Sequence, residues 1–184
     1  DAPVIEAPLT GAPVTMANGL NLHVPDSSAH ARELAQWSAI LPWFADNALV
    51  HYLAPRGLEQ FTGGGWGSRD ICQGPLEMLL ALGQLAPARD LLLRVFAAQN
   101  EAGDWPQWFT FFQREREIRA GDSHGDIIFW PLMALARYLE ASHDLEFLET
   151  RLPFHQAGAS VPTLWQHVER ALAHIEAHCL PGTL

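Results

Sequence analysis

The chain contains no lysine: all eleven of its basic residues are arginines. Schiff-base chemistry and a phosphate-loop lysine both require a lysine amine, so both are excluded within this chain. Cysteine is also scarce, because only Cys72 and Cys179 occur, far apart and outside any metal-binding spacing. We therefore expect free thiols in a reducing compartment and no metal ion.

Excess positive charge and long apolar runs are missing too. The formal net charge is −10 and the pI is about 5.2, which argues against nucleic acids and anionic membrane surfaces as partners. No apolar run reaches membrane-spanning length, and no signal peptide is visible. We therefore expect a cytoplasmic protein whose segment makes no membrane contact.

The residues that are present suit one compact domain. The chain has 184 residues, of which 48% are hydrophobic, enough to bury a real core. Residues 1–28 are punctuated by prolines and predict a linker or extended segment, with a short strand where Leu20, Leu22 and Val24 alternate with polar neighbours. Residues 29–184 are expected to form the domain.

Apolar residues at helical spacing dominate the domain. They predict helices over about 29–53, 75–83, 87–99, 127–141, 144–150 and 161–178. Pro42 is expected to kink or split the first of them. The pattern lacks alternating strands and predicts an all-α fold of helical hairpins, arranged as a bundle, a solenoid or part of a toroid.

Two segments between these helices concentrate the polar chemistry. The first holds Trp66, Arg69, Asp70 and Gln73, and the second holds Trp105, Gln107, Trp108, His124 and Asp126. Aromatic rings pack on the C–H face of a pyranose, while carboxylate, amide and guanidinium groups bind adjacent hydroxyls. The two loops therefore predict a sugar site.

Each of these residues also has a structural interpretation. Asp122 and Asp126 lie at or just before a predicted helix, where aspartate commonly caps the N-terminus. For the tryptophans beside glycine and proline, core packing and a ligand platform are equally favoured; these are Trp66, Trp105 and Trp108. The tryptophans on helix faces are predicted to pack in the core; these are Trp37, Trp43 and Trp165.

Three motifs carry a resemblance to a known family. They are Gly67-Ser-Arg-Asp-Ile-Cys-Gln73, Asn100-Glu-Ala-Gly-Asp104 with Pro106-Gln107, and Gly125-Asp126 four residues before Trp130. In these segments the chain resembles glycoside hydrolase family 94, the inverting phosphorylases of the cellobiose phosphorylase type. The family includes the phosphorylase-like region of cyclic β-1,2-glucan synthases. The resemblance spans about residues 38–180 and corresponds to the first half of a catalytic domain.

The resemblance implies an (α/α)6 toroid whose cleft binds a β-glucoside, with residues 29–184 as its N-terminal half. It implies that Asp126 is the general acid and that Arg69 and Asp70 bind sugar hydroxyls. Gln73, Gln107, His124 and Trp66 are implied as further substrate-binding residues. Inorganic phosphate is the co-substrate, and no other cofactor is expected. One carboxyl group then suffices, because phosphate is already an anionic nucleophile and only the leaving oxygen needs a proton.

Two features depart from the family pattern. Gly74 stands where the family commonly has an aspartate, and the chain stops at Leu184, before the second half of the toroid and much of the phosphate site. We therefore expect a fragment that is inactive alone. Its expected partners are a β-linked gluco-oligosaccharide and phosphate, and its full-length parent is expected to form a homodimer.

Two alternatives stay open. One is a non-catalytic or chain-length-controlling glucan-binding module of a β-glucan synthase, on the cytoplasmic side of a membrane. The other is an all-α interaction module whose loop carboxylates are only helix caps.

Overall fold

The computed structural model describes residues 30–53, 65–110, 125–155 and 161–178, without the side chains of residues 44–53. Helices make up most of this part of the chain, so the all-α prediction is confirmed. No helix within it is both long and apolar enough to cross a membrane. The predicted strand at residues 20–24, Phe44, Asp122, His124 and Cys179 lie outside the described residues or side chains.

Helices α2 (Ser68–Ala81) and α3 (Leu85–Ala97) form a hairpin. Gly83 turns the chain between them with a φ of +66°, a left-handed conformation that glycine adopts without strain. The Gln84 N–H donates to the carbonyl of Leu79 over 2.8 Å and closes the turn. A link this short makes the two helices antiparallel neighbours.

Helix α2 begins at Ser68, seven residues before the start predicted at Pro75, so the predicted boundary was wrong. Pro75 removes only one backbone hydrogen bond, that to the carbonyl four residues earlier. On the same helix face Ile71, Cys72, Leu76 and Leu79 are all buried. Their burial outweighs the lost bond, at roughly 1.5–3 kcal/mol for each large side chain. Arg69, Asp70 and Gln73 therefore lie on a helix rather than in a loop.

A small antiparallel sheet, which the sequence did not predict, ties the segment after α3 to the start of α2. Strand β1 (Trp66–Gly67) pairs with β2 (Trp108–Phe109), Trp66 opposite Phe109 and Gly67 opposite Trp108. The Ser68 N–H donates to the Gln107 carbonyl over 2.9 Å, and the Ser68 hydroxyl donates to the Pro106 carbonyl over 2.6 Å. The chain thus returns to the N-terminal end of α2.

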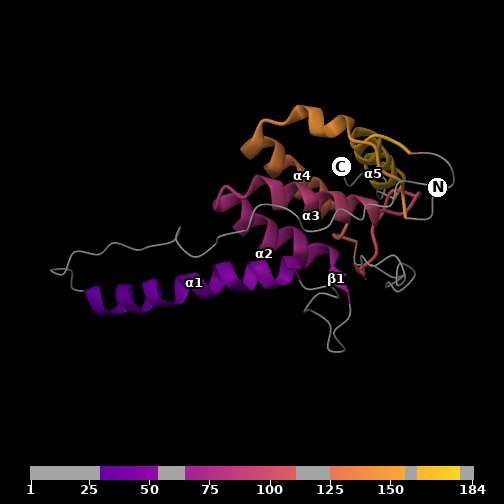
Figure 1. The fold of residues 1–184 in the computed structure, drawn as a ribbon. Coiled ribbons are helices and arrows are strands. Elements are labelled where there is room, and N and C mark those ends of the chain that lie inside the picture. Colours follow the sequence, from indigo (N-terminus) through magenta and orange to yellow (C-terminus); the bar gives the residue numbers. More distant parts are fainter. Residues whose placement is uncertain (1–29, 54–64, 111–124, 156–160, 179–184) are drawn as a thin grey trace.

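Helix α4 (Phe129–Ser142) packs against both α2 and α3 (Figure 1). Two ion pairs connect it to α2, Arg69 with Asp126 near the start of both helices and Glu77 with Arg137 further along. From the first pair to the second, the residue numbers rise in both helices. Helices α2 and α4 are therefore parallel and begin at the same end of the molecule. We call this end, where Arg69, Gln107 and Asp126 lie, the shared helix-start end.

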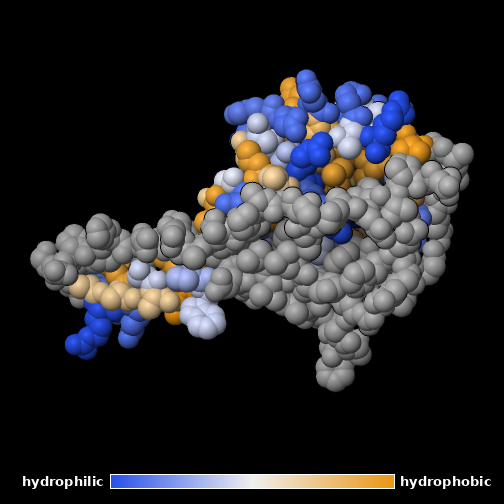
Figure 2. Space-filling model, in the orientation of Figure 1, coloured by the Kyte–Doolittle hydropathy of each residue, from blue (hydrophilic) through white to orange (hydrophobic). Residues whose placement is uncertain are grey.

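Helix α1 (Ala31–Leu53) lies along α2 (Figure 1). Pro42 lies inside it, and the structure assigns one continuous helix rather than two. Core packing of its tryptophans was predicted wrongly, because Trp37 is 55% exposed and Trp43 is 73% exposed. Both side chains are therefore open to solvent. The visible surface of α1 carries hydrophobic residues beside hydrophilic ones (Figure 2).

Helix α5 (Leu164–His178) packs against the 3-10 helix η2 (Leu145–Glu149). Its buried side is formed by Leu164, His167 and Ala171, whereas Leu172 is 51% exposed. The prediction that Trp165 packs in the core was also wrong, because Trp165 follows Leu164 by one residue and therefore projects to another side of the helix. It is 48% exposed.

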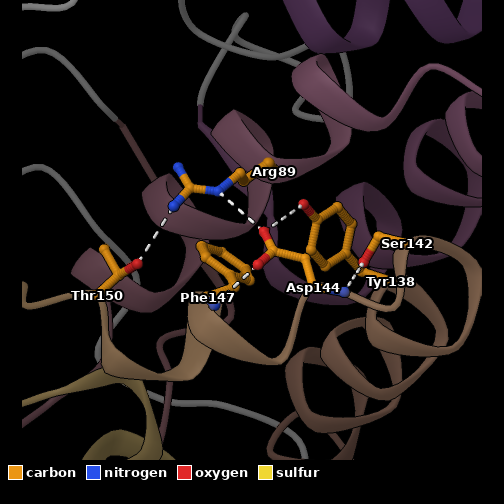
Figure 3. A network of polar contacts seen from close by, with 6 residues as sticks. All are labelled: Arg89, Tyr138, Ser142, Asp144, Phe147 and Thr150. Atoms are coloured by element: carbon orange, nitrogen blue, oxygen red, sulfur yellow. Dashed lines mark hydrogen bonds and ion pairs between the residues drawn. The ribbon is translucent and has the colours of Figure 1, made fainter.

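A polar network anchors η2 to α3 and α4 around Asp144 (Figure 3). The Asp144 carboxylate accepts from the Phe147 backbone N–H over 3.2 Å, which caps η2, and lies 3.8 Å from the Arg89 guanidinium of α3. Arg89 also donates to the Thr150 hydroxyl over 3.3 Å and lies 4.5 Å from the centroid of the Phe147 ring. The network gives Asp144 a structural role, because it joins η2 to α3.

His167 is a fully buried titratable group outside that network. Its Nδ1 lies 2.5 Å from Oε1 of Gln99 and its Nε2 lies 3.0 Å from the Leu152 carbonyl. Both partners are hydrogen-bond acceptors, yet a neutral ring can donate to only one of them. Burial nevertheless disfavours the imidazolium and lowers the pKa of His167 to about 4.

We predict that His167 makes the fold acid-sensitive. As the pH falls from 6.5 to 4, unfolded His167 gains a proton that the buried ring does not, so the free energy of unfolding decreases. The full loss is about 3 kcal/mol and persists below pH 4. NMR titration of the ring should give a midpoint near 4, and His167→Gln should flatten the dependence of urea unfolding on pH. A midpoint of 6.5 or above would show instead a buried imidazolium that donates to both oxygens.

Candidate functional site

The candidate site centres on an ion pair at the shared helix-start end. Arg69 lies in the first turn of α2, and Asp126 lies in the turn that precedes α4. The Arg69 Nη2 is 2.6 Å from Oδ1 and 2.5 Å from Oδ2 of Asp126. The Arg69 side chain is 34% exposed and that of Asp126 is 48% exposed, so the pair is open to solvent and to a ligand.

Trp130 contacts the same carboxylate from α4. Its indole N–H donates to Oδ2 of Asp126 over 3.2 Å, and the guanidinium carbon of Arg69 lies 5.9 Å from the centroid of its ring. The Trp130 hydrogen bond, followed by the hydrogen bond and charge of Arg69, lowers the pKa of Asp126, and desolvation opposes them only in part. Asp126 is therefore held as a carboxylate in the free protein.

Asp126 does not serve as the N-terminal cap of α4. Ile128 occupies the cap position, and it makes no side-chain cap hydrogen bond. The Asp126 carboxylate is engaged by Arg69 and Trp130 instead. For this residue, the structural interpretation as a simple helix cap was wrong.

Arg69 retains donors beyond those it gives to Asp126. Among the described residues it binds the carboxylate through Nη2 alone, and its Nε is buried without a hydrogen-bond partner. The two-nitrogen fork that arginine often forms with a carboxylate is therefore not used. A ligand oxygen could be bound by the remaining N–H groups.

Asp70 and Gln73 extend this polar surface along α2. Both are exposed, and neither side chain makes a hydrogen bond or ion pair with another described residue. Gln107 lies beside the start of α2, because its carbonyl accepts the Ser68 N–H. The sequence-predicted residues Arg69, Asp70, Gln107 and Asp126 thus share one end of the helices, whereas His124 lies outside the described residues.

Trp66 was predicted as a substrate-binding residue, and the structure corrects this. It is only 1% exposed, and its ring meets that of Phe109 edge-to-face at 6.0 Å between centroids. Trp105 is fully buried and donates its indole N–H to the Val95 carbonyl over 2.8 Å. Neither ring presents a face to a sugar, because the β1–β2 pairing draws this segment into the core. Trp108 remains partly exposed.

Trp130 had no predicted role. The sequence signal for its contact with Asp126 is the four-residue spacing of the two, because residues four apart lie on neighbouring turns of a helix.

Gly74 was expected to matter because the family commonly has an aspartate there. It is exposed on α2, and a Cβ atom at this position would meet nothing within 4 Å, so an aspartate would fit.

Cys72 follows Arg69 by three residues on α2 and is buried in the core. Burial, assisted by the charge of Asp70, raises the pKa of the free Cys72 thiol, which makes it a poor nucleophile. In the described ranges, no three His, Cys, Asp or Glu side chains are grouped to hold a metal ion. The arrangement presents charged and amide groups for binding hydroxyls.

The fold and the site together define the class of this protein: an all-α domain with a solvent-exposed carboxylate–guanidinium pair. No protein-family model matches the chain. The chain is 44% identical over 147 residues to a 1,2-β-oligoglucan phosphorylase of Listeria innocua. The match covers 77% of this chain and 13% of the length of that phosphorylase. The chain is therefore related to a phosphorylase, and a continuous match of this extent must include both Arg69 and Asp126.

We predict that removing Arg69 raises the pKa of Asp126. Arg69→Met deletes the positive charge and the donor while keeping an aliphatic stem, so the carboxyl group should protonate at higher pH. Arg137→Met is the matched control, because it breaks the other α2–α4 ion pair. NMR titration of the aspartate carboxyl carbons measures both. Equal shifts in the two variants would contradict a specific effect of Arg69.

Proposed function

We propose that this chain is part of a phosphorylase that cleaves β-linked glucose oligosaccharides with inorganic phosphate and releases α-glucose 1-phosphate. The observation that carries the proposal is the exposed Arg69–Asp126 pair at the shared helix-start end, within a chain related to a 1,2-β-oligoglucan phosphorylase. Asp70, Gln73, Gln107 and His124 are the further proposed contacts for sugar hydroxyls. Guanidinium, carboxylate and amide groups suit adjacent hydroxyls because they donate to and accept from neighbouring oxygens.

The proposed architecture is the first half of an (α/α)6 toroid. Helices α2 and α4 are parallel, and α3, which lies between them along the chain and packs against both, runs antiparallel. This supports the arrangement, because such a toroid alternates inner and outer helices. In this proposal α2 and α4 are inner helices whose N-terminal ends line the sugar site.

In the first candidate mechanism Asp126 is the general acid. Phosphate attacks the anomeric carbon as an anion, and Asp126 gives a proton to the departing glycosidic oxygen. The carboxyl group must then be protonated, although Trp130 and Arg69 lower its pKa in the free protein. Sugar hydroxyls that draw Arg69 away from Asp126 would raise that pKa and supply the required form.

A second role for Asp126 is favoured by the same lowered pKa. A carboxylate that stays ionised is a strong acceptor for sugar hydroxyls and a poor proton donor. Asp126 and Arg69 would then bind the sugar together, and another group of the whole enzyme would protonate the leaving oxygen. The proposed substrate is the same in both cases.

We predict that Arg69 is required for oligosaccharide binding. Arg69→Met should weaken binding of a β-1,2-linked glucose oligosaccharide about tenfold or more, the cost of losing a hydrogen bond from a charged group. Arg137→Met should bind as the wild type does. Isothermal titration of the complete polypeptide measures both, with a β-1,4-linked oligosaccharide to compare linkages. Equal losses in the two variants would contradict the proposed site.

We predict that Asp126→Asn separates the two roles. If Asp126 is the general acid, phosphorolysis of a natural oligosaccharide should fall by about 10²–10⁴-fold. β-Glucosides with leaving groups of low pKa need little protonation and should lose far less. A uniform loss across the leaving groups would assign Asp126 to sugar binding. Wild-type protein that binds glucan without any phosphorolysis would favour the glucan-binding module instead.

A further inference from the structure

We propose that Trp130 is a positioning residue that holds the Asp126 carboxylate in its ligand-binding orientation. The inference depends on the proposed function only for the identity of the ligand, a β-linked glucose oligosaccharide. Neither Trp130 nor its indole N–H contacts the ligand in this proposal. Trp130 acts on the ligand through Asp126.

The two partners of Asp126 differ in how firmly they are fixed. Arg69 is a long side chain with one-third of its surface exposed, so it can turn toward a ligand. Trp130 lies in the first turn of α4, and its ring packs against the hydrophobic core. The indole N–H therefore meets Oδ2 of Asp126 from an anchored ring, which has few alternative rotamers.

This difference matters once a sugar hydroxyl competes for Arg69. When Arg69 turns toward the hydroxyl, the Asp126 carboxylate loses its charged partner and could rotate about its side-chain bonds. The Trp130 N–H keeps Oδ2 in place and leaves Oδ1 available to accept from the ligand. The face of the same ring lies 5.9 Å from the guanidinium carbon, within the range in which a ring attracts a cation. Trp130 thus constrains both charged groups of the site.

Trp130 also contributes to packing, and a test must separate that contribution from positioning. Among the described residues, the side chains that contact the Asp126 carboxylate are the charged Arg69 from α2 and the uncharged Trp130 from α4. Trp130→Phe removes the indole N–H and keeps an aromatic ring. Leu139→Ala is the control, because it loosens the packing of α4 against the core without touching Asp126. Both variants are first checked for cooperative thermal unfolding.

The first measurement follows the ionisation of Asp126 without any ligand. Trp130→Phe should move the NMR titration midpoint of the Asp126 carboxyl carbon upward, since it removes the donor that stabilises the carboxylate. Leu139→Ala should leave that midpoint where it is in the wild type. An unchanged midpoint in Trp130→Phe, or the same shift in Leu139→Ala, overturns the proposal.

The second measurement uses binding of a β-1,2-linked glucose oligosaccharide in a double-mutant cycle. Trp130→Phe should weaken binding about three- to tenfold, the usual range for one hydrogen bond. In an Asp126→Ala background the same substitution should have no further effect, because Trp130 acts through the missing carboxylate. Additive losses overturn the proposal. A wild-type protein that does not bind the oligosaccharide contradicts the proposed function, while the titration of Asp126 still decides the role of Trp130.

Discussion

The attachment of the segment after α3 to the start of α2 is the constraint on which the site depends. β1 pairs with β2, and Ser68 bonds to the carbonyls of Pro106 and Gln107. A Cβ atom at Gly65 would collide with the carbonyl of Phe109, so this close backbone approach requires glycine there. α4 starts beside the same end of α2, and there Asp126 meets Arg69 from a position 57 residues along the chain.

The ion pair that results has two consequences that oppose each other. Arg69 and Trp130 give the carboxylate a defined position, which favours recognition of a polar ligand. The same contacts lower its pKa, which makes proton donation harder. A ligand that engages Arg69 would relieve part of this opposition. The electrostatics of the free site therefore bear directly on which role Asp126 has, and relatedness to a phosphorylase does not by itself assign that role.

The rest of the described molecule supports this end without forming part of it. The Asp144 network fixes η2 on α3 and α4, and His167 with Gln99 joins α5 to the segment after α3. Gln99 donates to the Gly103 carbonyl over 2.8 Å, and Gly103 adopts a φ of +109° against the backbone of Arg170. These polar contacts connect α5 and η2 to the scaffold that carries Arg69 and Asp126.

The sequence by itself determined the helical class and most helix positions within a few residues, and it singled out Arg69 and Asp126 as candidate site residues. Helical periodicity is local, and the two motifs are short. Only the tertiary structure decided which tryptophans are buried, because Trp66 and Trp37 differ in what packs over them and not in their own chemistry. The extension of α2 through Pro75 was likewise decided by packing, since the free energy of long-range burial exceeds local propensity.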